Sequence, residues 1–363
     1  MSGGFDDGFP AGLPAQIDGP AAWVGPELQR AGGWLQPLSQ AELGELEAAA
    51  APWLARAETD TAALNSLTPA GFALPSLAPR LAALRADLLR GPGFAVLRGL
   101  PVRRWGRRLA AVAFYGLGAH LGNARPQNAQ GHLLGHVRDV GLRVDDPNVR
   151  IYQTHERQTF HTDSCDIVGL LCLQNARSGG LSALVSSVTI YNRLRALRPE
   201  LARALFQPLA TDRRGEVPPG AKPYFEIPVF NWHQGAFAAI YQRQYVNSAQ
   251  RFADAPRLGA LQLEALDALD ALAEDPALHL MMALQPGDLQ FVHNHGLLHD
   301  RTAFDDWPEP ARRRYLLRLW LAPEDAQPLP PVYAQRYGNV VPGRRGGVAL
   351  PGIAGVMPLP EAA

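Results

Sequence analysis

The sequence predicts an α+β fold that is mainly β, with helices packed outside a core of strands. Two stretches carry the β prediction. The apolar run Ile167–Leu173 is β-branched at its start and ends in a Gly-Gly turn, which is typical of a buried strand. The stretch Arg314–Leu321 alternates, so every second side chain shares one face of a strand. Helical apolar periodicity early in the chain supplies the helices.

The remaining elements follow from periodicity and from turn and capping residues. The expected helices are one that Ser39-Gln40-Ala41-Glu42 opens with a capping box, one over 77–88, one over 188–206 interrupted by Pro199, and one over 261–274. Their core faces are expected at Leu43, Leu46, Ala50 and Trp53, at Leu77, Leu81, Leu84 and Leu88, and at Leu263, Leu266 and Leu269. Residues 94–97 form the first expected strand, and residues 289–292 form another after the turn Pro286-Gly287-Asp288.

Composition excludes several classes of protein. The chain has 363 residues, 47% of them apolar, and a formal net charge of +0, which argues against a disordered chain and against nucleic acid as a partner. No run reaches the ~18 apolar residues of a membrane span, and the acidic start Met1–Asp7 has no signal-peptide character. Cys165 and Cys172 point to opposite faces of a strand, so we expect no disulfide and a cytoplasmic location.

The triplet His161-Thr162-Asp163 supplies the candidate chemistry. Two histidines and one carboxylate can bind one face of a six-coordinate metal and leave the other face open, as in non-haem Fe(II) oxygenases. The second histidine must come from another strand, and His293, His295 and His299 all follow the strand at 289–292. Any of these three can complete the set. Arginines that point inward from the apolar strand at 314–321 need an anion to justify their burial.

Three blocks of sequence resemble the taurine and chlorophenoxyacetate dioxygenase (TauD/TfdA) family, from about Leu89 to Pro323. They are Gln158-Thr159-Phe160-His161-Thr162-Asp163 with Gly179-Gly180-Leu181-Ser182, then Pro286-Gly287-Asp288-Leu289 leading to Asn294 and Leu298-His299-Asp300-Arg301, then the Arg314/Arg318 strand. The resemblance implies a double-stranded β-helix, the jelly roll, and an Fe(II)- and 2-oxoglutarate-dependent dioxygenase that uses O2. Such an enzyme hydroxylates an unactivated C–H of a small molecule and converts 2-oxoglutarate to succinate and CO2.

The resemblance also implies residue roles. His161, Asp163 and His299 take the positions of the iron ligands, although His295 stays open as an alternative to His299. Arg314 takes the position that pairs with the distal carboxylate of 2-oxoglutarate, and Ser182 stands where the family often has a threonine that touches it. Arg318 falls where some members contact an anionic substrate or the co-substrate. Desaturation or cyclisation is an alternative outcome, and a catalytically silent jelly-roll binding protein is the alternative of another class.

The chain divides into an N-terminal extension with helices (1–88), the dioxygenase domain (89–323) and an irregular Pro/Gly-rich tail (324–363). The polar stretch 123–158 is either a solvated loop or a lid over the iron. In an extended segment Tyr241 and Arg243 share a face with Tyr245 and line a substrate pocket, or form a polar strand edge. His132, His136 and His155 are expected to be loop histidines rather than metal ligands. Family members often associate, so a homo-oligomer is compatible with the resemblance.

Overall fold

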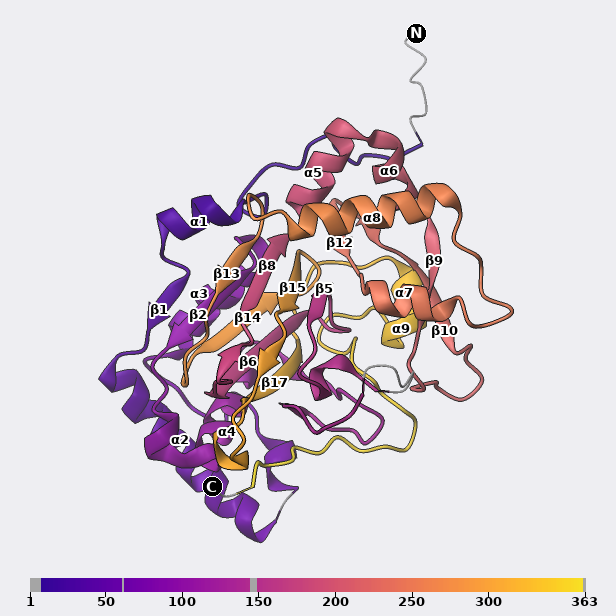
Figure 1. Ribbon diagram of the computed structural model, residues 1–363. Coiled ribbons are helices and arrows are strands. Elements are labelled where there is room, and N and C mark those ends of the chain that lie inside the picture. The colour runs from indigo at the N-terminus through magenta and orange to yellow at the C-terminus, as the bar shows by residue number, and fades with distance from the viewer. Residues whose placement is uncertain (1–7, 61, 144–148, 362–363) are drawn as a thin grey trace.

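The computed structural model describes residues 8–60, 62–143 and 149–361 (Figure 1). The expectations for Met1–Asp7, for residues 144–148 of the lid stretch and for the last two residues of the tail fall outside these ranges. Two sheets make up the centre of the fold. Helices cover the outer face of each sheet, so the expected jelly-roll layout with flanking helices is confirmed.

The larger sheet has seven strands and is antiparallel except at one edge, where β1 pairs in parallel with β2. Its order is β1 (Leu35–Pro37), β2 (Phe94–Arg98), β14 (Leu289–His293), β6 (Ile167–Gln174), β17 (Tyr315–Ala322) and β3 (Asn123–Ala124), with β4 (Leu134–Val137) also paired to β17. The expected strands at 94–97, 167–173, 289–292 and 314–321 all belong to this sheet.

The smaller sheet is antiparallel and has four strands. Its order is β13 (Leu280–Met282), β8 (Ser182–Ser186), β15 (Leu297–Arg301) and β5 (Gln158–His161). Three two-stranded ribbons complete the β structure: β9 (Pro208–Asp212) with β10 (Tyr224–Pro228), β11 (Phe230–His233) with β12 (Ala236–Ala239), and β7 (Ser178–Gly179) with β16 (Phe304–Asp305).

The helices lie outside the two sheets. On the larger sheet pack α2 (Gln40–Thr59), α3 (Ala78–Arg90) and α4 (Val102–Ala119); on the smaller pack α5 (Ser187–Leu197), α6 (Pro199–Ala204) and α8 (Ala260–Glu274). Shorter helices are α1 (Gly25–Ala31), α7 (Arg243–Ala249) and α9 (Ala334–Tyr337), with 3-10 turns at Ala63–Ser66, Ile151–Gln153, Pro310–Arg312 and Pro331–Tyr333. No helix in the described ranges is both long and apolar enough to cross a membrane.

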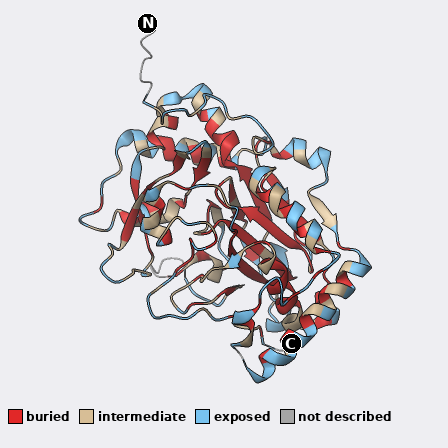
Figure 2. Ribbon diagram, turned by 180° about the vertical axis from the view of Figure 1, so that it is seen from behind, coloured by how far each residue is buried: buried red, intermediate tan, exposed pale blue. Residues whose placement is uncertain are grey.

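Apolar side chains form three main buried layers. Figure 2 colours the buried residues red, and they include most of the strands at the centre of the fold. Leu171, Phe291 and Leu317 of the larger sheet pack against the helices on its outer face. Leu184 and Leu316 lie in the layer between the two sheets. Because side chains alternate along a strand, β2, β14, β6 and β17 contribute side chains to both layers, and inward positions of this sheet can carry a site.

The expected helices are confirmed, and the expected capping box of α2 is present. The Ser39 hydroxyl accepts from the Glu42 N–H at 3.2 Å, and the Glu42 carboxylate accepts from the Ser39 N–H at 2.7 Å. The expected core faces of α2 and α3 are buried. Pro199 ends α5 and begins α6 as its first residue, where a proline costs no hydrogen bond.

Four local expectations are wrong. Leu263 of α8 is 39% exposed, since the buried stripe of that helix runs through Ala265, Leu266 and Leu269 instead. Arg243 begins helix α7, so residues 241–245 are not an extended face. The stretch 123–158 is not simply a loop, because β3 and β4 pair with β17. Residues 94–97 are not the first strand, since β1 precedes them.

Candidate metal centre and co-substrate cavity

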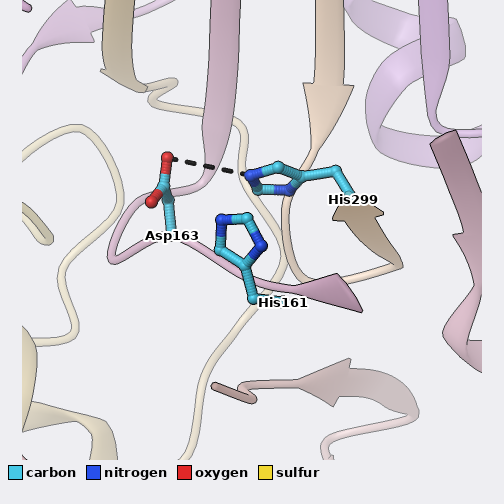
Figure 3. A group of neighbouring side chains, drawn as sticks. All are labelled: His161, Asp163 and His299. Atoms are coloured by element: carbon cyan, nitrogen blue, oxygen red, sulfur yellow. Dashed lines mark ion pairs between the residues drawn. The ribbon is translucent and has the colours of Figure 1, made fainter. Parts of the chain in front are cut away.

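His161 and His299 are brought together by strand register. β5 and β15 are antiparallel neighbours in the smaller sheet, and the Cα of His161 lies directly opposite that of His299. The two ring centroids are 4.1 Å apart. Asp163 lies just beyond the end of β5, and its carboxylate turns back toward both rings (Figure 3). One ligand atom from each residue lies within 4.8 Å of the other two, so the three side chains form a cluster able to hold a metal ion.

The loop that carries Asp163 is held in place by hydrogen bonds. The side-chain oxygen of Asn294 accepts from the Asp163 N–H at 2.8 Å, and its amide nitrogen donates to the backbone carbonyls of Asp163 and Cys165. Trp320 Nε1 donates to the Asp163 carboxylate at 2.8 Å, and Arg318 Nη1 lies 3.1 Å from the same oxygen. The carboxylate is therefore positioned from both its backbone and its side chain.

Hydrogen bonding determines which nitrogen of His161 is free. Nδ1 lies 2.8 Å from the Thr159 carbonyl oxygen, which can only accept, so Nδ1 carries the proton. Nε2 then holds the lone pair, and the Gln158 side-chain nitrogen lies 2.8 Å from it. In His299, Nδ1 is buried and has no hydrogen-bond partner, while Nε2 faces Asp163 at 3.9 Å.

The electrostatics of the cluster suit a divalent cation. Burial lowers the pKa of His161 and lowers that of His299 to about 3, so both imidazoles are neutral near pH 7. Burial by itself would raise the pKa of Asp163, but the charge of Arg318 and the hydrogen bond from Trp320 lower it to about 2. Two neutral imidazoles and an ionised carboxylate are the protonation states that metal binding requires.

A cavity between the two sheets opens onto this cluster. Ser182 of β8 and Arg314, just before β17, line it together with His161, Asp163 and His299. Arg314 is only 5% exposed, its Nη1 is buried without a hydrogen bond, and burial lowers its pKa to about 10. In the described ranges no carboxylate forms an ion pair with this guanidinium, so the cavity presents a buried cation that lacks an anion.

A second cavity also borders the cluster. It shares Tyr152, Gln158, His161, Asp163 and Arg318 with the first cavity. Beyond these shared residues its wall includes Tyr241 and Tyr245. The candidate metal cluster therefore borders two cavities.

The structure separates the other predicted residues from this centre. His295 lies 2.9 Å from Asp166 in a fully buried pair, so His299 rather than His295 stands beside His161 and Asp163. Arg243 pairs with Asp267 and Asp270 and does not line either cavity.

The three expected loop histidines also lie away from the cluster. His132 hydrogen-bonds to the Asn128 side chain, and His136 donates to the Pro358 carbonyl. His155 pairs with Asp139. His136 differs from the expectation because it lies in strand β4 rather than in a loop.

Comparison with known proteins decides the family. Residues 60–320 match the family described as taurine catabolism dioxygenase TauD, TfdA family. The chain belongs to this TauD/TfdA family. FR-33289 synthase of Streptomyces rubellomurinus is 31% identical over 327 residues, which cover 88% of this oxygenase and 94% of that protein. Taurine hydroxylase-like protein SAT17 of Stachybotrys chartarum is 32% identical and covers 87% and 82% of the two chains.

Solved structures agree on the fold of the TauD/TfdA oxygenase. Asparagine oxygenase in complex with Fe(II), 3-hydroxyasparagine and succinate has a TM-score of 0.61 at 22% identity, over 79% of this chain and 93% of that one. The non-haem iron oxygenase OrfP in complex with Fe and α-ketoglutaric acid has a TM-score of 0.57 at 19% identity, over 79% and 93%.

Membership of the family confirms the expected activity. This TauD/TfdA oxygenase is an Fe(II)- and 2-oxoglutarate-dependent dioxygenase that hydroxylates a small molecule with O2 and converts 2-oxoglutarate to succinate and CO2.

Several residues of the site carry no role in the sequence analysis. Asn294 appears there only as part of a motif, and Gln127, whose side chain accepts from Arg318 Nε at 2.8 Å, lies in the stretch interpreted as a loop or lid. Arg213 and Arg336 of the second cavity are also missed. Local patterns could not identify Gln127, Arg213 and Arg336, because each reaches the site from a segment distant in sequence from His161 and His299.

Proposed function

We propose that His161, Asp163 and His299 hold the iron of this oxygenase. The observation that carries the proposal is the cross-strand pair His161–His299 with Asp163 beside it, in the protonation states that a divalent metal needs. The bond from His161 Nδ1 to Thr159 directs the Nε2 lone pair to the metal, and the Gln158 amide must move aside when the ion binds.

The cavity between the sheets is proposed as the 2-oxoglutarate site. Arg314 would pair with the distal carboxylate, which would give its buried guanidinium an anion, and the Ser182 hydroxyl would donate a further hydrogen bond. Arg318 lines both cavities, but it already pairs with Asp163 and Gln127. We therefore assign Arg318 to orienting the Asp163 carboxylate rather than to binding the distal end of the co-substrate.

The second cavity is proposed as the substrate site. Bound Fe(II) and 2-oxoglutarate would supply the O2-derived oxidant at the junction of the two cavities. The protein would hold a substrate C–H at that junction, with Tyr241 in the wall and the stretch 123–158 contributing Tyr152 as part of a lid. An intact carboxylate at position 163 keeps all three protein ligands, which supports hydroxylation over halogenation.

The proposal extends to the setting of the enzyme. The substrate site is a cavity fitted to a small molecule, so neither nucleic acid nor a membrane is proposed as a partner. Both cysteines are buried free thiols, which supports a reducing cytoplasm. A homo-oligomer is compatible with this arrangement.

An anaerobic titration tests the metal and co-substrate assignment. Adding Fe(II) and 2-oxoglutarate to the iron-free protein should produce the weak visible charge-transfer band of the chelate, and His161→Ala should lose that band. Folded wild-type protein that gives no band would refute the ligand assignment. Product analysis by mass spectrometry then separates hydroxylation from desaturation, since the first adds one oxygen and the second removes two hydrogens.

A further inference from the structure

We propose that the second cavity contains a subsite for a dianionic phosphate ester or phosphonate group of the substrate, formed by Arg213 and Arg336 with Arg150 beside them. The proposal rests on the proposed function, because it places the acidic end of the substrate in the cavity that opens onto the iron ligands. Arg150, Arg213 and Arg336 all line this cavity.

Arg213 and Arg336 converge on one aromatic ring. The guanidinium carbon of Arg213 is 5.6 Å from the centre of the Phe225 ring, and that of Arg336 is 5.8 Å from the same centre. Phe225 also lines the cavity. Arg213 is 6% exposed and the Arg336 side chain 8% exposed, so both cations are largely removed from water.

Neutral groups hold these two arginines. Arg213 Nε donates to the Lys222 carbonyl at 3.0 Å and its Nη2 donates to the Gln335 carbonyl. Arg336 Nε donates to the Ser164 hydroxyl at 2.8 Å. These bonds fix the orientation of both guanidinium groups without neutralising either charge. Burial lowers the pKa of each arginine to about 10, and both therefore remain cationic at neutral pH.

The charges around this end of the cavity do not balance. Among the described residues the carboxylate shared by the cluster is Glu216, which pairs with Arg150 and lies 3.9 Å from Arg336. Within the described ranges, three guanidinium groups against this one carboxylate leave two positive charges, because Asp163, whose charge also acts on Arg336, is paired with Arg318. Asp212 also lines the cavity, but Arg251 pairs with it at 2.8 Å and makes that pair neutral. A dianion is the ligand that would neutralise the remaining charge.

The excess of two positive charges favours a dianionic oxyanion over a singly charged carboxylate. Planar guanidinium groups bind phosphoryl oxygens through paired hydrogen bonds, and two guanidinium groups that line one cavity can engage different oxygens of one such group. The subsite is also linked to the reacting centre, because Ser164, which holds Arg336, directly follows Asp163. An acidic group anchored there would fix the orientation of the rest of the substrate toward the iron ligands.

Calorimetry on the anaerobic Fe(II)- and 2-oxoglutarate-loaded enzyme tests the subsite with two probes of similar shape. Phenyl phosphate, with a second pKa of about 6, is dianionic at about pH 8, whereas benzenesulfonate is a monoanion. We expect phenyl phosphate to bind at least ~10-fold more tightly, and Arg213→Met and Arg336→Met each to weaken it by about ten- to a hundred-fold. Arg104→Met, which removes an exposed guanidinium paired with Glu47 and lining neither cavity, is the control and should change nothing.

Glu216→Gln provides an independent arm should an arginine variant fail to fold. Removing that carboxylate raises the net positive charge, so phenyl phosphate should bind more tightly to this variant than to wild type. Equal affinity for both probes in wild type, or unchanged phenyl phosphate affinity in the folded variants, would overturn the subsite. The chelate band reports separately on the proposed function. If the chelate band is present but phenyl phosphate and benzenesulfonate bind equally well, only the subsite is refuted. If the chelate band is absent, the iron assignment is refuted.

Discussion

Replacing Arg314 by methionine should weaken 2-oxoglutarate binding and leave the metal-free protein at least as stable as wild type. The guanidinium lies in the cavity between the sheets, and no carboxylate in the described ranges pairs with it. If Arg314 serves to bind 2-oxoglutarate, its buried charge should destabilise the protein without ligand and contribute favourably only when the carboxylate of the co-substrate is bound. The two effects of this one substitution therefore have opposite signs.

The magnitudes follow from the burial of Arg314. Its pKa falls from 12.5 to about 10, which corresponds to a destabilisation of the charged form of about 3 kcal/mol. Removing the charge relieves that cost, and the loss of its contact with Phe304, 5.1 Å from the ring centre, offsets a small part. A hydrogen-bonded Arg–carboxylate contact contributes about 1.5–3 kcal/mol, so the dissociation constant of 2-oxoglutarate should rise about ten- to a hundred-fold.

Two measurements on the same variant check this expectation. Anaerobic titration of the chelate band gives the affinity for 2-oxoglutarate, and urea unfolding of the metal-free protein gives its free energy of unfolding. Arg313→Met is the matched control, because Arg313 is adjacent in sequence but exposed, and its side chain donates to the carbonyls of Trp307 and Pro308. Normal 2-oxoglutarate affinity in Arg314→Met, or a loss of several kcal/mol of stability, would show that an internal partner neutralises this arginine.

Two further predictions follow from the same site, and a third concerns the buried His293 at the end of β14. Asp163→Ala should abolish O2-dependent turnover while the near-ultraviolet circular dichroism spectrum stays native. Because Arg318 loses its partner, the free energy of unfolding in urea should also fall by about 3–5 kcal/mol. Normal turnover in this variant would contradict the ligand assignment. Asn294→Ala should weaken Fe(II) affinity measured by the chelate band, because the Asp163 loop loses three hydrogen bonds, and an unchanged affinity would exclude that positioning role. Burial lowers the pKa of His293 from 6.5 to about 3 in the folded protein. Between pH 3 and pH 6.5 this histidine is therefore protonated in the unfolded chain and neutral in the folded protein. The free energy of unfolding should therefore fall as pH drops through this window, and His293→Gln should reduce the slope by ~1.4 kcal/mol per pH unit; an unchanged slope would place the titration elsewhere.

The sequence predicted helices correctly where residues within a few turns of one another determine them, as capping residues and a helical apolar stripe do. The capping box at Ser39 and the leucine stripe of α3 are satisfied within a few turns of chain, so they are visible in the sequence. The helix α4 was not predicted, and its chain turns at Gly106, whose φ is 72°, within an arginine-rich beginning. Arg243 was misplaced because its helix and its partners Asp267 and Asp270 are set by tertiary packing.

The sequence by itself determined the candidate ligand types, the inward-facing positions of Arg314 and Arg318, and the family, because these depend on residue identity and on the two-residue period of a strand. Only the tertiary structure decided that His299 rather than His295 stands opposite His161. Both histidines follow β14, and the register of β15 on β5 separates them, which is a long-range pairing that no local pattern encodes. The same holds for Arg213 and Arg336. Arg213, which directly follows β9, and Arg336 of the C-terminal tail are far apart in sequence. The fold packs both guanidinium groups against the Phe225 ring.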